Sequence, residues 1–265
     1  MRQLTDTIDF NRIISEIPEN SSINLLLDYD GTLAPFRKER DRAFPYPGIE
    51  DVLRGLIALD RFRVIIISGR AADDIMHLLD LETYPEIWGC HGAEQYTADG
   101  EYHIRKLPAG TEEGIRKGWL AIRNAGLSEH CEKKPTSLAI HWRGLDPSRK
   151  NLINETVHRE LDRLTGKNGL TLSEFDGGIE LRYADIDKGD VIEKIIEETD
   201  DSELILYFGD DYTDEDAFNA LKGKGISLLV RPEFRETSAD IWIEPPRELI
   251  MILNNLLQMC GGKNG

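Results

Sequence analysis

Hydrophobic residues in the first part of the chain fall into short unbroken runs, separated by segments in which they recur at every third or fourth position. An unbroken apolar run is typical of a strand buried on both faces of a sheet, whereas the longer period is typical of a helix with one buried face. Alternating strands and helices of this kind predict a parallel sheet with right-handed crossover connections. The expected strands are residues 23–29, 63–68 and 87–91, and the expected helices are residues 47–59 and 71–79.

The pattern changes after about residue 107 and returns to strand–helix alternation at Lys188. We therefore predict an α/β protein with a Rossmann-like parallel-sheet core, formed by residues 1–108 and 184–265, into which a small α+β domain of residues 109–183 is inserted. In the inserted segment we expect helices at 111–124 and 147–164 and strands at 138–142, 170–174 and 179–182. Beyond it we expect helices at 188–198, 213–221 and 246–259 and strands at 204–209 and 226–230.

Charge and composition restrict the partners that the chain can have. Lysine and arginine total 32 against 49 aspartates and glutamates, which gives a formal net charge of −17 over 265 residues. So acidic a chain repels a polyphosphate backbone, and we expect no nucleic-acid partner. No apolar stretch approaches the ~18 residues that a membrane span needs. The N-terminus lacks a signal-peptide pattern, and the chain has 3 cysteines, which are widely scattered. We expect a monomeric cytoplasmic protein that does not bind membranes.

Two clusters of acidic residues follow directly on predicted strands. Since ligands of open α/β sheets bind beyond the carboxyl ends of the strands, we expect both clusters to meet at one edge of the sheet. Hard carboxylate oxygens suit Mg²⁺, which takes one or two carboxylates together with a substrate phosphate. A lone Asp-x-Asp is more often a helix cap or a loop residue, but two such clusters favour phosphoryl chemistry. The acids are Asp28 and Asp30 at the end of the first strand and just beyond it, and Asp210, Asp211 and Asp214 after the strand at 204–209.

The same residue types supply a mechanism. A carboxylate such as Asp28 can attack phosphorus and form an aspartyl-phosphate, and an acid two residues on can protonate the leaving oxygen and later deprotonate water. Ser68 ends a predicted strand and precedes Gly69, where a hydroxyl and backbone N–H groups can face an anion. Lys188 begins a predicted helix, a position that disfavours a cation unless an anion lies nearby. Taken alone, Ser68 would be an ordinary turn residue and Lys188 a solvated surface residue.

In their order these motifs resemble those of the haloacid dehalogenase superfamily of phosphatases. Asp28-Tyr29-Asp30-Gly31-Thr32 resembles its first motif, Ser68-Gly69-Arg70 its second, Lys188-Gly189 its third, and Gly209-Asp210-Asp211 with Asp214 its fourth. The inserted segment resembles the C2-type cap domain of that superfamily. The resemblance implies that Asp28 is the nucleophile, that Asp30 is the general acid/base, and that Ser68 and Lys188 bind the phosphoryl oxygens. It also implies a Mg²⁺ ion held by Asp28, the backbone carbonyl of Asp30 and Asp210, with Asp211 and Asp214 in support.

Within that superfamily, further segments resemble the trehalose-6-phosphate phosphatase family. The most specific are His91-Gly92-Ala93-Glu94 and the fourth motif, and the likeness extends from about Leu25 to Leu229. It implies hydrolysis of a small sugar phosphate, trehalose 6-phosphate, to trehalose and phosphate. The residues that the likeness assigns to substrate binding are Gly69, Arg70 and His91 in the core, and Glu132, Lys134, His141, Arg143, Glu180 and Arg182 in the inserted domain. On an alternating strand, His141 and Arg143 share one face and Trp142 packs on the other.

The sugar itself stays open, because the chain departs from the family at one strand. A Gly-Lys pair commonly precedes the family's Glu-x-Arg strand and a proline follows it, whereas here Gly177-Gly178 precedes Glu180-Leu181-Arg182 and Tyr183 follows. A sugar phosphate of the sucrose-6-phosphate or mannosyl-3-phosphoglycerate type is therefore an alternative substrate. A phosphorylated signalling receiver is less favoured, because receivers lack an acid equivalent to Asp30 and an inserted domain. An inactive binding protein is also less favoured, because each motif position keeps its chemical group.

Overall fold

The computed structural model describes residues 1–5, 9–18, 21–37, 39–175 and 177–261. The chain divides into two compact units. Met1–His103 and Lys188–Gly265 form the first, called the core unit below, and Ile104–Asp187 form the second, called the insert. None of the helices in the described ranges is long and apolar enough to cross a lipid bilayer.

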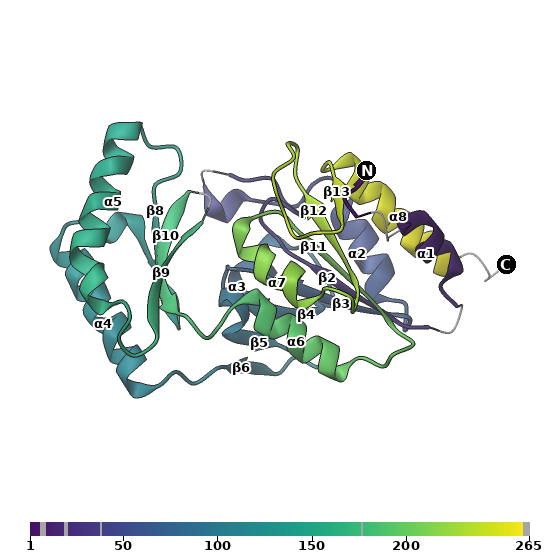
Figure 1. The fold of residues 1–265 in the computed structure, drawn as a ribbon, viewed down its shortest axis with the longest axis horizontal. Helices are drawn as coiled ribbons and strands as arrows, with labels where there is room; N and C mark the ends of the chain where they lie inside the picture. The colour runs from purple at the N-terminus through teal and green to yellow at the C-terminus, as the bar shows by residue number, and fades with distance from the viewer. Residues whose placement is uncertain (6–8, 19–20, 38, 176, 262–265) are drawn as a thin grey trace. The chain divides into compact units, whose positions relative to one another are not determined.

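A sheet runs through the core unit in the strand order β1-β13-β12-β11-β2-β3-β4-β5-β6, counted over the described residues (Figure 1). Neighbouring strands are parallel from β13 to β4, whereas β1 and β5 pair antiparallel with β13 and β4. Strand β2 is central, because β11 and β3 pair with its two edges. The strands are β1 Arg2–Gln3, β2 Ile23–Leu27, β3 Phe62–Ile67, β4 Glu86–Gly89, β5 Glu94–Tyr96, β6 Tyr102–Ile104, β11 Leu204–Gly209, β12 Ile226–Val230 and β13 Ile241–Ile243.

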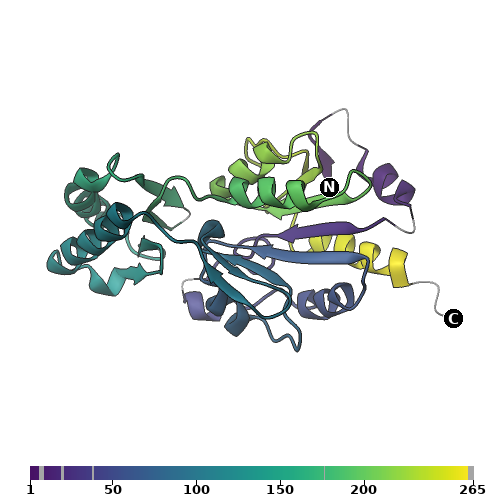
Figure 2. The same ribbon diagram turned by 90° about the horizontal axis from the view of Figure 1, so that it is seen from below.

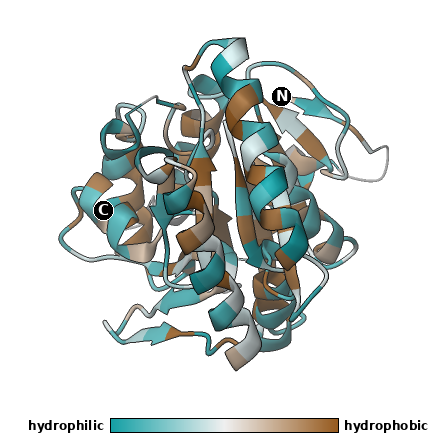
Figure 3. Ribbon diagram, turned by 90° about the vertical axis from the view of Figure 1, so that its left-hand side faces the viewer, coloured by the Kyte–Doolittle hydropathy of each residue, from teal (hydrophilic) through white to brown (hydrophobic). Residues whose placement is uncertain are grey.

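Helices cover both faces of this sheet, which is why its central strands are apolar without alternation. Leu25 and Leu27 of β2 belong to the hydrophobic core shared with α1, α2, α3 and α8 on one face, and Leu26 belongs to the core shared with α6 and α7 on the other. Figure 2 shows helices on both sides of the sheet. In Figure 3 the helices carry both hydrophobic and hydrophilic residues, as helices with one buried face do. The helices are α1 Phe10–Glu16, α2 Ile49–Ile57, α3 Ala72–Leu78, α6 Lys188–Glu198, α7 Glu215–Ala220 and α8 Arg247–Gly261.

The insert consists of a four-stranded antiparallel sheet, in the order β7-β8-β10-β9, and the helices α4 and α5. Helix α4 packs closely on one face of this sheet, since a Cβ on its Gly118 would lie 2.8 Å from Leu181 and 3.1 Å from Leu138. Neighbouring residues of a strand point to opposite faces, so Glu180 lies on the face away from α4. The elements are α4 Ala109–Asn124, β7 Cys131–Lys133, β8 Ser137–His141, α5 Pro147–Leu161, β9 Leu170–Phe175 and β10 Gly178–Tyr183.

The predicted fold class is confirmed, with a mostly parallel core sheet and a separate antiparallel sheet in the insert. Strand β4 ends at Gly89 and not at residue 91, because Cys90 and His91 have φ angles of 50° and 60°, which lie outside the β region. The helix expected at 213–221 begins as a 3₁₀ turn and continues as α7. Short 3₁₀ helices occur at η1 Arg40–Arg42, η2 Cys90–Gly92, η3 Ser128–His130, η4 Asp162–Leu164 and η5 Tyr212–Asp214.

Several short elements were not predicted from the sequence. The strands β1, β5, β6, β7 and β13 have two or three residues each, and α1 has seven. So few residues show no period, and the strands form only by pairing with longer neighbours.

Candidate active site

The first acidic cluster lies where β2 leaves the sheet. The backbone N–H of Asp28 donates to the carbonyl of Phe208 in β11 at 2.8 Å, which extends the β2–β11 pairing by one residue. Asp28 is therefore fixed next to the carboxyl end of β11, where Asp210 begins the second cluster. Both carboxylates are buried. The expectation that the two clusters meet at one edge of the sheet is confirmed by this geometry.

Gly31 explains why glycine follows the Asp-x-Asp pair. Its φ angle is +86°, in the left-handed region, and a Cβ there would lie 2.2 Å from Oδ2 of Asp210. Such a separation is far inside van der Waals contact, so any other residue would displace the Asp210 carboxylate. The turn is closed by hydrogen bonds from the N–H of Gly31 to the carbonyl of Ala34 (2.7 Å) and from the N–H of Leu33 to the carbonyl of Tyr29 (2.9 Å).

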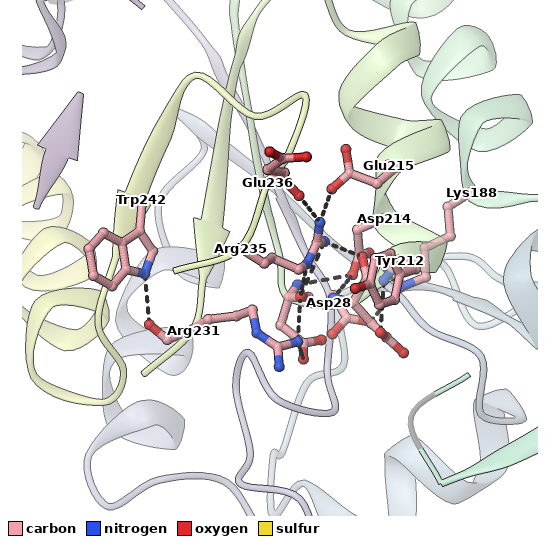
Figure 4. Close-up of polar contacts among 11 residues, drawn as sticks. Asp28, Lys188, Tyr212, Asp214, Glu215, Arg231, Arg235, Glu236 and Trp242 are labelled. Atoms are coloured by element: carbon pink, nitrogen blue, oxygen red, sulfur yellow. Dashed lines mark hydrogen bonds and ion pairs between the residues drawn. The ribbon is translucent and has the colours of Figure 1, made fainter. Parts of the chain in front are cut away.

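Lys188 carries the positive charge of this cluster. The residue begins α6 and is buried. Its Nζ donates to Oδ1 of Asp28 at 2.7 Å and to Oδ1 of Asp214 at 2.6 Å (Figure 4). Burial alone would lower the pKa of Lys188, but the carboxylates of Asp214 and Asp28 raise it, so the side chain stays charged.

Asp214 holds the loop after β11 in place. Its Oδ2 accepts hydrogen bonds from the backbone N–H groups of Asp210 (2.9 Å) and Asp211 (2.8 Å), and its Oδ1 accepts from the hydroxyl of Tyr207 as well as from Lys188. Burial alone would raise the pKa of Asp214, but Lys188 and these hydrogen bonds lower it. With both oxygens occupied, Asp214 is an ionised anchor for the loop.

Asp28, Asp210 and Asp214 each offer one carboxylate oxygen to a site in which these atoms lie within 4.8 Å of one another. Oδ2 of Asp28 is buried and accepts no hydrogen bond from any residue that the structure describes. Burial raises the pKa of Asp28 to about 7, against the lowering effect of Lys188, and burial together with neighbouring carboxylates raises that of Asp210 well above its ordinary value. A free buried carboxylate oxygen among concentrated negative charge fits a divalent cation with hard oxygen ligands.

Asp30 and Asp211 lie outside this group of three. Asp211 accepts a hydrogen bond from the backbone N–H of Tyr212 at 2.8 Å and so caps the 3₁₀ turn η5. Asp30 is bound through both oxygens by the guanidinium group of Arg70, with Nε–Oδ2 and Nη2–Oδ1 distances of 2.6 and 2.7 Å. Two predicted site residues therefore form an ion pair with each other: Arg70 binds the carboxylate of Asp30, the predicted general acid/base.

The other residues of the second motif and of the His-Gly-Ala-Glu segment pack against each other. Oγ of Ser68, which is buried, accepts from the backbone N–H of Arg70 at 3.1 Å. The imidazole of His91 lies so close to Gly69 that a Cβ there would be 2.7 Å from the ring. Glu94 has a structural role that the sequence did not reveal, since its Oε2 accepts from the N–H of Ala72 at 2.9 Å at the first turn of α3.

In the insert, most predicted sugar-binding residues lie on the sheet face away from α4, where they pair with one another. Nζ of Lys134 donates to Glu180 at 2.9 Å, and both side chains are buried. Nε2 of His141 lies 2.9 Å from Oε2 of Glu132. Nε of Arg182 donates to Oγ of Ser173 in the neighbouring strand β9 at 3.0 Å. Arg143 lies against Gly177, where a Cβ would be 2.7 Å from its Nε. Trp142 is buried, as expected.

Two arginines at the second cluster were missed in the sequence. Nη1 of Arg231 donates to the carbonyl of Asp210 at 3.1 Å and lies 3.8 Å from its Oδ2, and Nη2 of Arg235 donates to the carbonyl of Asp211 at 2.8 Å (Figure 4). Arg231 directly follows β12, so the strand-end rule that found the aspartates also applies to it. Arg235 lies within a loop, and no sequence pattern indicates its contact.

The sequence of this chain matches a family of known proteins. Residues 26–240 match the family model described as trehalose-phosphatase. A probable trehalose-phosphate phosphatase of Oryza sativa subsp. japonica is 28% identical over 272 residues, which cover 93% of this chain and 72% of the rice protein. The matched range includes all the clustered carboxylates and Lys188.

Solved structures share the fold. The C-terminal domain of C. albicans trehalose-6-phosphate phosphatase superimposes with a TM-score of 0.79 at 22% identity, over 97% of this chain and 99% of that one. A Bacteroides thetaiotaomicron phosphatase of the haloalkanoate (HAD) superfamily superimposes with a TM-score of 0.60 at 18% identity, over 89% and 95% of the two chains. Because the trehalose-phosphatase model matches most of its length, this chain belongs to the trehalose-phosphatase family.

Proposed function

We propose that the protein is a Mg²⁺-dependent phosphatase that hydrolyses trehalose 6-phosphate to trehalose and phosphate through an aspartyl-phosphate on Asp28. The observation that carries the proposal is the state of Asp28: one carboxylate oxygen is held by Lys188, and the other is buried without a partner among the described residues. A nucleophile needs such a fixed carboxylate with an oxygen that is free to react. Family membership and the name of the rice relative support the substrate.

In the first step an oxygen of the Asp28 carboxylate attacks phosphorus, and the bond between phosphorus and the sugar oxygen breaks. Asp30 gives its proton to the departing sugar oxygen. Both oxygens of Asp30 accept from Arg70 in this structure, so protonation of Asp30 weakens these contacts by removing the negative charge that Arg70 faces. Lys188 keeps the Asp28 carboxylate oriented, and Ser68 and Lys188 are proposed to bind the phosphoryl oxygens.

In the second step water attacks the same phosphorus atom and gives a proton to Asp30, while the bond from phosphorus to Asp28 breaks. Inorganic phosphate leaves, and both aspartates return to their starting states. The acid that served the first step is the base of the second.

Asp28 and Asp210, with the backbone carbonyl of Asp30, are proposed to hold Mg²⁺, with Asp211 and Asp214 in support. When bound, the ion neutralises charge on the phosphoryl group and orients it. The donor set fits, because it consists of hard oxygens and the carboxylates of Asp28, Asp210 and Asp214 each bring one oxygen within 4.8 Å of the others.

We propose that the inserted domain, residues 109–183, binds the sugar part of the substrate. Its polar sheet face carries carboxylates, an imidazole and cations, groups that accept from or donate to sugar hydroxyls. The residues proposed are Glu132, Lys134, His141, Arg143, Glu180 and Arg182, together with Gly69, Arg70 and His91 of the core unit. Lys134 and Glu180 are paired with each other at 2.9 Å, and the hydroxyl of Ser137 also donates to Glu180, so we propose that these two residues contribute to the sugar site as a connected pair.

The substrate proposal predicts a preference among phosphate esters. Purified protein should release phosphate from trehalose 6-phosphate with a kcat/KM well above that for sucrose 6-phosphate, mannosyl-3-phosphoglycerate and monosaccharide phosphates. A colorimetric phosphate assay across this panel measures it. A higher value for one of the alternative sugar phosphates would replace trehalose 6-phosphate, and no turnover of any ester would contradict the phosphatase itself.

The nucleophile proposal predicts that Asp28→Asn lowers kcat roughly 10⁴-fold or more, because an amide does not form the phosphate ester. Its circular dichroism should match the wild type, since the amide oxygen still accepts from Lys188. Asp201→Asn is the matched control: Asp201 is exposed at the amino end of β11, and its replacement should leave kcat unchanged. Turnover by Asp28→Asn near the wild-type rate would assign the nucleophile elsewhere.

The acid/base proposal predicts that the effect of Asp30→Asn depends on the leaving group. For a sugar phosphate, whose alkoxide needs a proton, kcat/KM should fall by about 10²–10⁴. For p-nitrophenyl phosphate, whose phenolate leaves unprotonated, the rate of the first step should fall far less. Rapid-mixing kinetics of p-nitrophenol release measures that step. Equal losses for both esters would show that Asp30 does not protonate the leaving group.

The raised pKa values of Asp28 and Asp210 predict how pH affects stability without a divalent cation. These groups bind more protons folded than unfolded, so the stability that Asp28 contributes is present below its ordinary pKa of 3.8 and is lost as the pH rises through about 7. The lowered pKa of Asp214 changes the stability with pH only at more acidic pH. Mg²⁺ should therefore raise the melting temperature of chelator-treated protein by a few degrees more at about pH 8 than at about pH 5.5.

Differential scanning calorimetry with and without Mg²⁺ measures this difference. Asp28→Asn, which lacks the titrating carboxyl, should reduce it. Equal stabilisation by Mg²⁺ at both pH values would contradict a cation bound by protonatable aspartates.

A further inference from the structure

Arg235 reaches the second acidic cluster from the loop between β12 and β13. Its Nη2 donates to the carbonyl of Asp211 at 2.8 Å, and Nε and Nη2 both lie 3.4 Å from the carbonyl of Asp210. The guanidinium group also lies over the ring of Tyr212, 4.8 Å from the centroid. The side chain is only 12% exposed, so these contacts use a largely desolvated cation.

Glu215, the first residue of α7, fixes this guanidinium group. Its Oε1 accepts from Nη1 of Arg235, to which the carbonyl of Glu236 is also bound at 2.9 Å (Figure 4). The same carboxylate accepts from the hydroxyl of Thr237 at 2.8 Å and from the N–H of Ser238 at 2.7 Å. The loop after β12 is thus tied to the start of α7 by one carboxylate.

The peptide group between Asp210 and Asp211 is held at both ends. Asp214 accepts from its N–H at 2.8 Å, and its carbonyl accepts from Arg235 at 3.4 Å and from Arg231 at 3.1 Å. The peptide groups on either side are each held at one end, by Asp214 at the N–H of Asp210 and by Arg235 at the carbonyl of Asp211. Fixing both ends of a peptide group fixes the direction of the Cα–Cβ bonds beside it. The carboxylate of Asp210 is thereby directed towards Gly31 and the Asp28 site.

We propose that Arg235, held by Glu215, is a positioning residue that keeps the Asp210 carboxylate ready to bind a divalent cation. The inference rests on the proposed function, because it presupposes a cation at Asp28 and Asp210. Outer contacts that orient a metal ligand typically change metal affinity 10–100-fold when they are lost. A purely structural arginine would change only the stability of the protein.

Isothermal titration calorimetry with Mg²⁺ on the chelator-treated protein tests this. Arg235→Ala should weaken Mg²⁺ binding by about tenfold or more. Glu215→Gln, whose amide oxygen still accepts from Arg235, and Arg235→Lys, whose ammonium group reaches fewer acceptors, should weaken it less. If Arg235→Ala does not fold, the Mg²⁺ affinities of these two milder variants are compared with that of the wild type instead.

The matched control is Arg63→Ala in β3. Arg63 makes ion pairs of 2.8 Å with Glu86 and Glu198, and it lies near the amino end of its strand, at the edge of the sheet away from the aspartates. Its loss should lower the melting temperature and leave Mg²⁺ affinity unchanged. In Arg235→Ala the Mg²⁺ concentration for half-maximal activity should rise, while kcat at saturating Mg²⁺ stays near the wild-type value.

Wild-type Mg²⁺ affinity in all the variants at Arg235 and Glu215 would overturn the positioning role and leave the proposed function standing. Equal weakening by Arg63→Ala would also overturn it, because the effect would then follow stability. A wild-type protein without affinity for Mg²⁺ would overturn the metal site, and the positioning role with it.

Discussion

Three carboxylates are buried close together only where positive charge compensates them, and Lys188 supplies that charge. Its ammonium group joins Asp28, which follows β2, to Asp214, which follows β11, at 2.7 and 2.6 Å. Removing charged groups from water costs several kcal/mol for each ion, roughly, and the mutual attraction of well-placed partners offsets it. Asp214 is ionised by this contact and in turn binds the backbone of the loop that carries Asp210. The site is therefore one electrostatic unit that spans both segments of the core unit.

Much of this unit was predictable, because it follows from rules that act along the sequence. Apolar runs locate parallel strands, and the carboxyl ends of parallel strands lie at one edge of the sheet, so the sequence predicts Asp28 and Asp210 at the same edge. A lysine at the first position of a helix is unfavourable without an anion, which favoured a functional Lys188, but the role itself was implied by the resemblance. The domain limits and the roles of the site residues stay predictions.

What the sequence did not reveal depends on side chains that meet across the fold. The pairing of Arg70 with Asp30 connects loops after two strands, and the residue types alone do not distinguish it from a free substrate-binding arginine. Arg235 acts through backbone carbonyls, which every residue has, so its contact leaves no mark in the sequence. Glu94 belongs to a family-like motif, yet its carboxylate caps α3. A motif can thus record a requirement of the fold as well as of the chemistry.

The central place of β2 has a consequence for how the chain matures during synthesis. Strand β2 is made early, but its partner β11 follows the entire insert, and the register pairs Leu204 with Ile23 and Phe208 with Leu27. Since ribosomes add about 5–20 residues per second, β2 waits for roughly 9–35 s with the backbone N–H and C=O groups of one edge unpaired. The insert, whose strands pair only with each other in the described residues, has no such delay. The nascent chain therefore depends on β3 and its neighbours to hold β2 in solution until the second segment emerges and completes the sheet.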